Sequence, residues 1–225
     1  MWTDTGIKFT QPSIAEIYHT VMSPKLQHWW TRHELVPSES VKEIDWQTTR
    51  LTMPRLTPSE RVGVTKTASE NCGVGTTLVT WKHQSEATCP RCSHPHEDTK
   101  HIAQCQGHGA ARKCAPSLRR LRTLLKKLHT SPDIRRNLIK GLERWHRGKS
   151  LRSKHLSQEL RAAVQQQGRI GWHRMFEGLF AQEWQVLQQQ CLDAHQSRRS
   201  AAAWAQSFLP AVVRIGKSQW KHRND

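Results

Sequence analysis

Tyrosine, acidic residues and hydrophobic residues are all scarce in this chain. It has one tyrosine and 18 acidic residues against 35 lysines and arginines, and 36% of its 225 residues are hydrophobic. The single tyrosine, Tyr18, is followed by His19, so the chain has no Tyr-x-Asp-Asp polymerase motif. The acids are scattered, without the clustering that a Mg²⁺-dependent polymerase or nuclease needs. We therefore expect no catalysis from carboxylate-bound magnesium.

Long apolar runs are also missing. No stretch of about 18 apolar residues occurs, so the sequence predicts no membrane-spanning helix. The N-terminus lacks the basic start and apolar run of a secretory signal. Six cysteines in a chain without such a signal favour metal ligands in a reducing compartment over disulfides. We expect an intracellular protein, nuclear or cytoplasmic and not secreted.

Positive charge is abundant, and it is concentrated in one region. The formal net charge is +17. Sixteen lysines and arginines but only three acids lie between Arg112 and Arg161. A solvated surface is the plainer explanation, but an excess this local favours a polyanion partner. We expect phosphate contacts from eight side chains: Arg119, Arg120, Arg122, Lys126, Lys127, Arg135, Arg136 and Lys140.

Hydrophobic periodicity predicts a mainly α protein. A first helix is expected to begin at Ser13, and later ones after Thr57, Pro116 and Ser131. Residues 73–81 are rich in β-branched side chains and predict a short strand or extended loop. Apolar residues stepping by three and four predict one long helix over 172–191 and a last helix over 204–220, which Pro210 should kink.

The predicted organisation places a small zinc module between helical parts. We expect a CCHC module inserted between an N-terminal helical part and a C-terminal helical bundle. The expected segments are an N-terminal helical part (1–71), a zinc-binding module (72–115), a basic helical pair (116–147), a linker (148–153) and Trp-rich C-terminal helices (154–225).

The zinc prediction rests on Cys89, Cys92, His101 and Cys105. Cys-Pro-Arg-Cys closes a tight turn that aims two sulfurs at one point, and His-x-x-x-Cys on a helix places two ligands on one face. Four protein ligands leave no position for water, so we expect one structural Zn²⁺ ion. The alternative is a set of metal-free cysteines. Three nearby histidines compete for the imidazole position but have no cysteine four residues downstream: His94, His96 and His108.

This motif carries a family resemblance. Cys-Pro-Arg-Cys followed by Glu-Asp-x-x-His-x-x-x-Cys, residues 89–105, resembles the zinc-binding segment that follows the polymerase domain in reverse transcriptases of non-LTR retroelements. Short sequence motifs along the chain are similar to those of retroelement-derived open reading frames of microalgae. These motifs include Ile44-Asp45-Trp46, Ile170-Gly171-Trp172 and Trp220-Lys221-His222-Arg223-Asn224. Such modules usually have glycine after the second cysteine. Ser93 stands there in this chain, and we expect its φ to stay negative.

The resemblance implies nucleic-acid association, with RNA or DNA, beside a polymerase-containing chain. A predicted helix reaches the last residues, as expected of a fragment or of one piece of a longer polyprotein. Two alternatives stay open. One is a metal-dependent nuclease built on some of the fourteen histidines, notably His33, His83, His94, His96 and His108. The other is a protein-interaction module that uses the Trp-rich helices, although packing of these helices on each other is the plainer account. The oligomeric state is left open.

Overall fold

The computed structural model describes residues 25, 27–107, 109–151 and 153–224. Within these ranges the chain is helical, and its one β-type pairing is an isolated bridge between Ile44 and Ala181. The prediction of a mainly α protein is therefore confirmed. The helix expected at Ser13 lies outside the described residues. None of the described helices combines the length and the apolar character needed to cross a membrane.

The chain divides into two compact units, one ending at Lys42 and one beginning at Glu43. In the first unit, residues 27–32 are helical. The 3-10 helix η1 (Ser38–Glu43) follows. Every predicted segment from residue 72 onward lies in the second unit.

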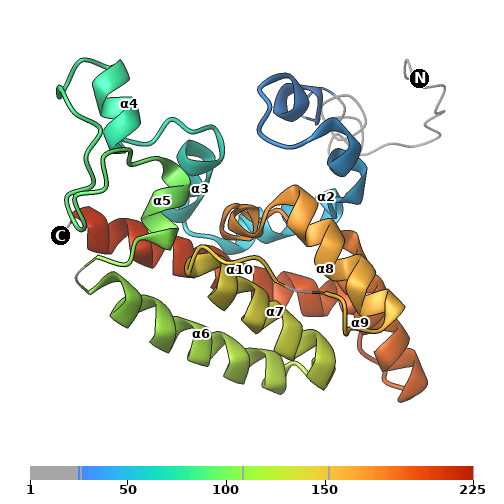
Figure 1. Cartoon of the computed structure of the whole chain (residues 1–225). Coiled ribbons are helices and arrows are strands. Elements are labelled where there is room, and N and C mark those ends of the chain that lie inside the picture. The colour runs from blue at the N-terminus through green and yellow to red at the C-terminus, as the bar shows by residue number, and fades with distance from the viewer. Residues whose placement is uncertain (1–24, 26, 108, 152, 225) are drawn as a thin grey trace. The chain divides into compact units, whose positions relative to one another are not determined.

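The second unit contains the remaining elements (Figure 1). They are α2 (Trp46–Thr52), η2 (Met53–Arg55), α3 (Pro58–Ala68), α4 (Gly75–Thr80), α5 (Thr99–Gln104), α6 (Ala110–Lys127), α7 (Pro132–His146), α8 (Gln158–Ile170), η3 (Trp172–Glu177), α9 (Gln182–Ala194) and α10 (Ala201–Asn224). The last helix, α10, contacts α2, α3, α5, α6, α9 and η3. It therefore packs against early helices of the unit as well as late ones.

Aromatic side chains form much of the core around α10. Phe180, Trp184, Trp204 and Phe208 are all buried. Phe180 lies against both Trp204 and Phe208, with ring centroids 6.0 and 5.3 Å apart. The indole N–H of Trp204 donates to the Thr130 hydroxyl at 2.7 Å, so this buried polar atom is satisfied. The Trp-rich faces thus pack within the unit, which was the plainer of the two accounts.

The prediction of a strand or extended loop at 73–81 is wrong, because residues 75–80 form helix α4. Hydrogen bonds from α4 to Glu97, in another segment of the chain, stabilise the helix. The Glu97 carboxylate accepts a hydrogen bond from the Gly75 N–H at 2.9 Å, and the Glu97 carbonyl accepts one from Thr76 at 3.0 Å. These bonds satisfy N–H groups at the start of a helix that β-branched residues alone do not favour.

The single long helix expected over 172–191 is also wrong, because the segment divides into η3 and α9. Gly178 has a φ of +85°, a conformation that ends η3. The Phe180 carbonyl then accepts a hydrogen bond from the Asp45 N–H at 2.8 Å instead of continuing a helix. The apolar spacing was helical, but the aromatic residues reach the core from two elements.

Three further helices differ in detail from the predictions. Helix α6 begins at Ala110, earlier than expected, and contains Pro116 in its interior. Helix α7 begins directly after Ser131 as predicted, although the Ser131 side chain makes no capping bond. Helix α10 runs from Ala201 to Asn224, beyond both ends of the predicted helix, and contains Pro210 in its interior. Leu118, Leu121 and Leu125 are buried along one face of α6, and the free energy of their burial offsets the cost of a proline inside the helix.

Candidate metal centre

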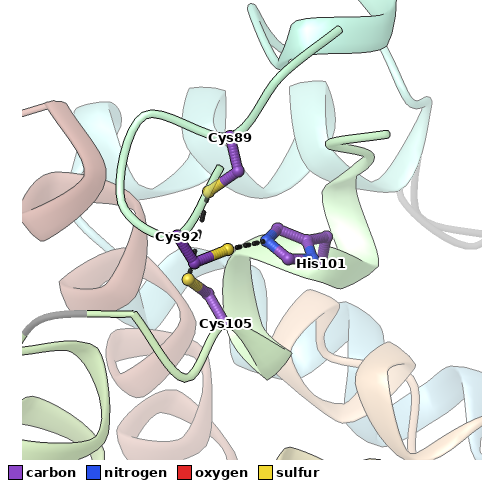
Figure 2. Close-up of side chains that lie close together, drawn as sticks. All are labelled: Cys89, Cys92, His101 and Cys105. Atoms are coloured by element: carbon purple, nitrogen blue, oxygen red, sulfur yellow. Dashed lines mark hydrogen bonds between the residues drawn. The ribbon is translucent and has the colours of Figure 1, made fainter. Parts of the chain in front are cut away.

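The structure brings the four predicted ligands together. The ligand atoms of Cys89, Cys92, His101 and Cys105 all lie within 4.8 Å of one another. Figure 2 shows their side chains pointing toward a common centre. The Cys89 and Cys105 sulfurs are 3.9 Å apart, and the Cys92 sulfur is 3.3 Å from His101 Nε2. Zinc-length bonds in a tetrahedron would separate two sulfurs by about 3.8 Å and a sulfur and a nitrogen by about 3.6 Å. These two distances are close to the tetrahedral values, and the cluster could hold one metal ion.

A tight turn supplies the first two ligands. Ser93 N–H donates to the Cys89 carbonyl at 2.9 Å, and Cys89 N–H donates to the His94 carbonyl at 2.8 Å. The expectation that Ser93 keeps a negative φ is wrong, because its φ is +59°. Closing the turn around two converging sulfurs requires this left-handed conformation, which a Cβ atom disfavours.

Helix α5 supplies the imidazole, and the residue that ends it supplies the last thiol. Asp98 caps this helix as predicted, accepting a hydrogen bond from the His101 N–H at 2.6 Å. The His101 ring stacks on that of His94 at 4.6 Å between centroids, which orients Nε2 toward the sulfurs. Cys105 follows the helix directly. The short helix thus places two ligands on the face toward the turn.

Burial favours the neutral forms of two of the ligands. Burial raises the pKa of the Cys105 thiol to about 11. Burial, followed by the charge of His94, lowers the pKa of His101, so its ring stays neutral and keeps a lone pair. A buried thiol with so high a pKa releases its proton when a metal ion takes its place. Metal binding here is therefore coupled to proton release.

The buried Glu97 and the partly buried Arg223 form an ion pair beside the ligands, and sequence reasoning missed it. Arg223 Nε and Nη2 donate to the two Glu97 oxygens at 3.1 and 2.6 Å. Burial opposes ionisation of Glu97, but the bonds from Arg223 and from the Gly75 N–H outweigh it and lower the Glu97 pKa. No local pattern pointed to Arg223, which is 126 residues away.

The ligand loop also contacts the ends of the two basic helices. Cys89 and Cys105 form a small buried cluster with Ala110, the first residue of α6. Gln104 and Gln106, on either side of Cys105, donate to the carbonyls of Trp145 and His146 at 2.9 and 2.7 Å. These carbonyls lie at the C-terminal end of α7. The candidate metal centre therefore joins the start of α6 to the end of α7.

Gly107 allows the loop after Cys105 to approach the ligand turn. A Cβ atom on Gly107 would lie 2.4 Å from the Arg91 carbonyl oxygen and 2.9 Å from the Cys92 Cβ. The Gly107 N–H also lies 3.3 Å from the Cys105 sulfur, as a donor to it. A side chain at this position would push the two ligand segments apart.

The other cysteines and histidines of the described ranges stay outside this cluster. Cys72 and Cys114 are buried, and burial raises the pKa of each thiol to about 11, as expected of small buried hydrophobic residues. Cys191 is only partly buried. His94 and His96 are exposed, and His108 lies outside the described residues. Within the described ranges, no other group of three or more His, Cys, Asp or Glu side chains is arranged to hold a metal.

The eight predicted phosphate-binding residues lie on α6 and α7, which pack side by side (Figure 1). Seven are exposed, and Arg135 is partly buried. The two helices have only two acids, Asp133 and Glu143. Asp133 pairs with Arg136 at 3.0 Å and Glu143 with Arg122 at 3.7 Å. The exposed faces of these helices therefore carry a strong positive excess, and they are called the basic surface below.

Comparison of the chain with protein-family models, with curated proteins and with solved structures finds no match.

Proposed function

We propose that the protein is a nucleic-acid-binding accessory region, stabilised by one zinc ion and without catalysis of its own. The observation that carries the proposal is the one-sided charge of the basic surface. Its cations reach solvent from two adjacent helices, and its two acids face partners of their own. An array of exposed Lys and Arg side chains with only two interspersed carboxylates suits the regular negative charge of a nucleic-acid backbone.

The chemistry of the ligands supports zinc as the metal. Three thiolates and one imidazole are soft and borderline donors, which suit Zn²⁺ and not Mg²⁺ or Ca²⁺. Four protein ligands complete a tetrahedral site, so the ion has no open position at which to activate water. Its role is then structural.

The structural role of the ion would be to maintain the geometry of the basic surface. The ligand loop holds the first residue of α6 through the buried contact with Ala110. It holds the end of α7 through the hydrogen bonds from Gln104 and Gln106. Zinc would thereby fix the two basic helices relative to each other, and phosphate contacts depend on that spacing.

The resemblance of residues 89–105 to retroelement reverse transcriptases supports a polymerase-containing chain as the wider context. In that setting the basic surface would bind the RNA or DNA that the polymerase copies. A nuclear or cytoplasmic location accords with such a partner and with reduced cysteines.

The two alternatives have less support. A metal-dependent nuclease needs an open metal site, and the one candidate cluster in the described ranges has four protein ligands. A protein-interaction module would need exposed aromatic faces on the Trp-rich helices, but Trp172, Trp184 and Trp204 are buried.

The test is a salt titration of binding by the zinc-loaded protein to single-stranded, duplex and hybrid oligonucleotides. We expect log K to fall linearly with log salt, with a slope of about −0.7 to −0.9 per neutralised phosphate. No binding to any of the three at about 50 mM salt would contradict the proposal, since electrostatic binding is strongest at low salt.

A further inference from the structure

A second feature of the molecule lies where helix α7 ends. The residues after α7 and the facing residues of α5, α8 and η3 enclose a hollow of about 520 Å³. This volume falls in the range of roughly 300–1,000 Å³ typical of sites for small organic groups. The hollow is distinct from the metal cluster, since none of the four ligands lines it.

One wall of the hollow is aromatic. The half-buried ring of Trp145 stacks on His173, with centroids 5.8 Å apart and planes inclined by 23°. Trp172, buried against the backbone of α7 at Gly141, lines the hollow as well. Burial, with the charges of Arg174 and Lys100, lowers the pKa of His173 to about 3, so its ring is neutral at physiological pH. This wall offers flat apolar rings to a planar group.

The rim of the hollow is positive. Lys100 and Lys149 line it and are exposed, and no carboxylate is among its lining residues. Lys149 follows α7 by three residues, Arg147 is exposed directly after the helix, and Lys140 is exposed in its middle. The hollow therefore continues the basic surface and suits a ligand that combines an aromatic plane with an anion.

We propose that this hollow binds one unpaired nucleobase of a single strand together with its adjoining phosphate. The base stacks on the Trp145–His173 pair, and the phosphate contacts Lys100 and Lys149. The inference rests on the proposed function and adds to it a preference for unpaired nucleic acid. A paired base cannot enter, because its faces are covered by its neighbours in the duplex.

Two glycine variants test the hollow without removing any side chain. Gly168 on α8 lines it, and Gly63 on α3 lines a different pocket. A Cβ atom on either residue would meet no atom within 4 Å. Gly168→Leu therefore fills the hollow, and Gly63→Leu is a matched control with the same change in helix propensity.

The probes are a mixed-sequence single strand of about 12 nucleotides and the duplex of the same length. We expect Gly168→Leu to weaken single-strand binding about tenfold, the loss of one stacked base, and to leave duplex binding unchanged. Gly63→Leu should change neither. Wild-type protein that binds neither probe would contradict the proposed function. Two outcomes would contradict this inference alone, provided that the wild-type protein binds both probes. In the first, Gly168→Leu binds the single strand as well as wild type does. In the second, Gly168→Leu loses affinity for the single strand and the duplex equally.

Two further experiments test the phosphate contact and the identity of the ligand. Replacing Lys100 and Lys149 with Gln should lower single-strand affinity more than replacing the exposed Lys66 and Lys82, which removes the same charge away from the hollow. Equal losses from the two pairs would overturn the phosphate contact. Adenosine monophosphate that competes as tightly as the oligonucleotide would assign the hollow to a free nucleotide and overturn the single strand as its ligand.

Discussion

Arg223, near the end of α10, donates two hydrogen bonds to the Glu97 carboxylate, whose side chain is 0% exposed. Glu97 lies between the two pairs of metal ligands in the sequence. Its carboxylate also accepts the Gly75 N–H, so one side chain ties α4 and α10 to the ligand loop. This pair makes the last helix part of the same unit as the candidate metal centre.

Breaking this pair from the arginine side should be strongly destabilising. Arg223→Gln leaves a buried carboxylate without its countercharge, which costs about 3–5 kcal/mol of unfolding free energy. Denaturant unfolding of the zinc-loaded protein measures the change. Arg136→Gln is the matched control, because its pair with Asp133 is exposed on both sides and contributes about 0–1 kcal/mol.

A double variant checks the cause of that loss. In Glu97→Gln/Arg223→Gln the buried charge is gone as well, so the double variant should be more stable than Arg223→Gln alone. A double variant as unstable as the sum of both single variants would mean that the two residues act independently and that the pair is unimportant.

Metal removal should unfold the ligand module. Purified protein is expected to hold close to one zinc per chain, and Cys89→Ser, Cys92→Ser or Cys105→Ser should each abolish it. Binding of structural zinc and folding of a small module are one equilibrium, so chelation should lower the unfolding temperature. Elemental analysis and thermal unfolding measure both effects. Cys191→Ser, which alters a cysteine outside the cluster, should change neither. Zinc-free protein with unchanged unfolding would refute the prediction.

Ser93 offers a stabilising substitution. With a φ of +59°, Ser93→Gly should remove about 1 kcal/mol of backbone strain and slow the loss of zinc to a chelator. Lys82→Gly is the control, because Lys82 has a φ of +61° outside the ligand turn. That variant should gain stability without a change in zinc exchange. Equal zinc exchange in Ser93→Gly and wild type would show that the turn is not strained.

The sequence predicted the metal cluster well because its ligands are close in the chain. Cys89 and Cys92 share one turn, and Asp98 caps the helix that carries His101, so short-range spacing determined where all four side chains point. The mainly α class followed from helical periodicity in the same way. Only the sign of φ at Ser93 was missed, since it depends on how the finished turn closes.

Features that depend on distant residues were not predictable in this way. Four of the six residues at 75–80 are β-branched, yet the segment is helical because Glu97 caps it from another segment. The aromatic residues after Trp172 keep helical spacing, yet Gly178 divides them between two elements. No local sequence pattern predicted the Glu97–Arg223 pair. In each case a long-range contact decided between local structures of similar energy.

The basic surface should give a measurable salt dependence. Replacing Arg119, Arg120, Lys126 and Lys127 with Gln should reduce the log–log salt slope by about 0.7 to 0.9 for each phosphate that is no longer neutralised. The control replaces four exposed cations outside the two helices: Arg50, Arg61, Lys66 and Lys82. Its slope should stay near that of wild type. If the two quadruple variants reduce the slope equally, the basic surface is only a solvated one.

The zinc-loaded protein should neither cleave nor extend nucleic acid. We expect no cleavage or polymerisation on single-stranded, duplex or hybrid substrates with Mg²⁺ or Mn²⁺, even at high protein concentration. The physical reason is that the four-ligand cluster has no position for a reacting water, and no second metal cluster occurs in the described ranges. Gel analysis of end-labelled substrates measures this directly. Binding should persist in EDTA only while zinc is retained, because the ion positions α6 and α7. Metal-dependent cleavage that disappears on replacing one candidate histidine would favour the nuclease alternative, and the variants to compare are those of His33, His83, His94, His96 and His108.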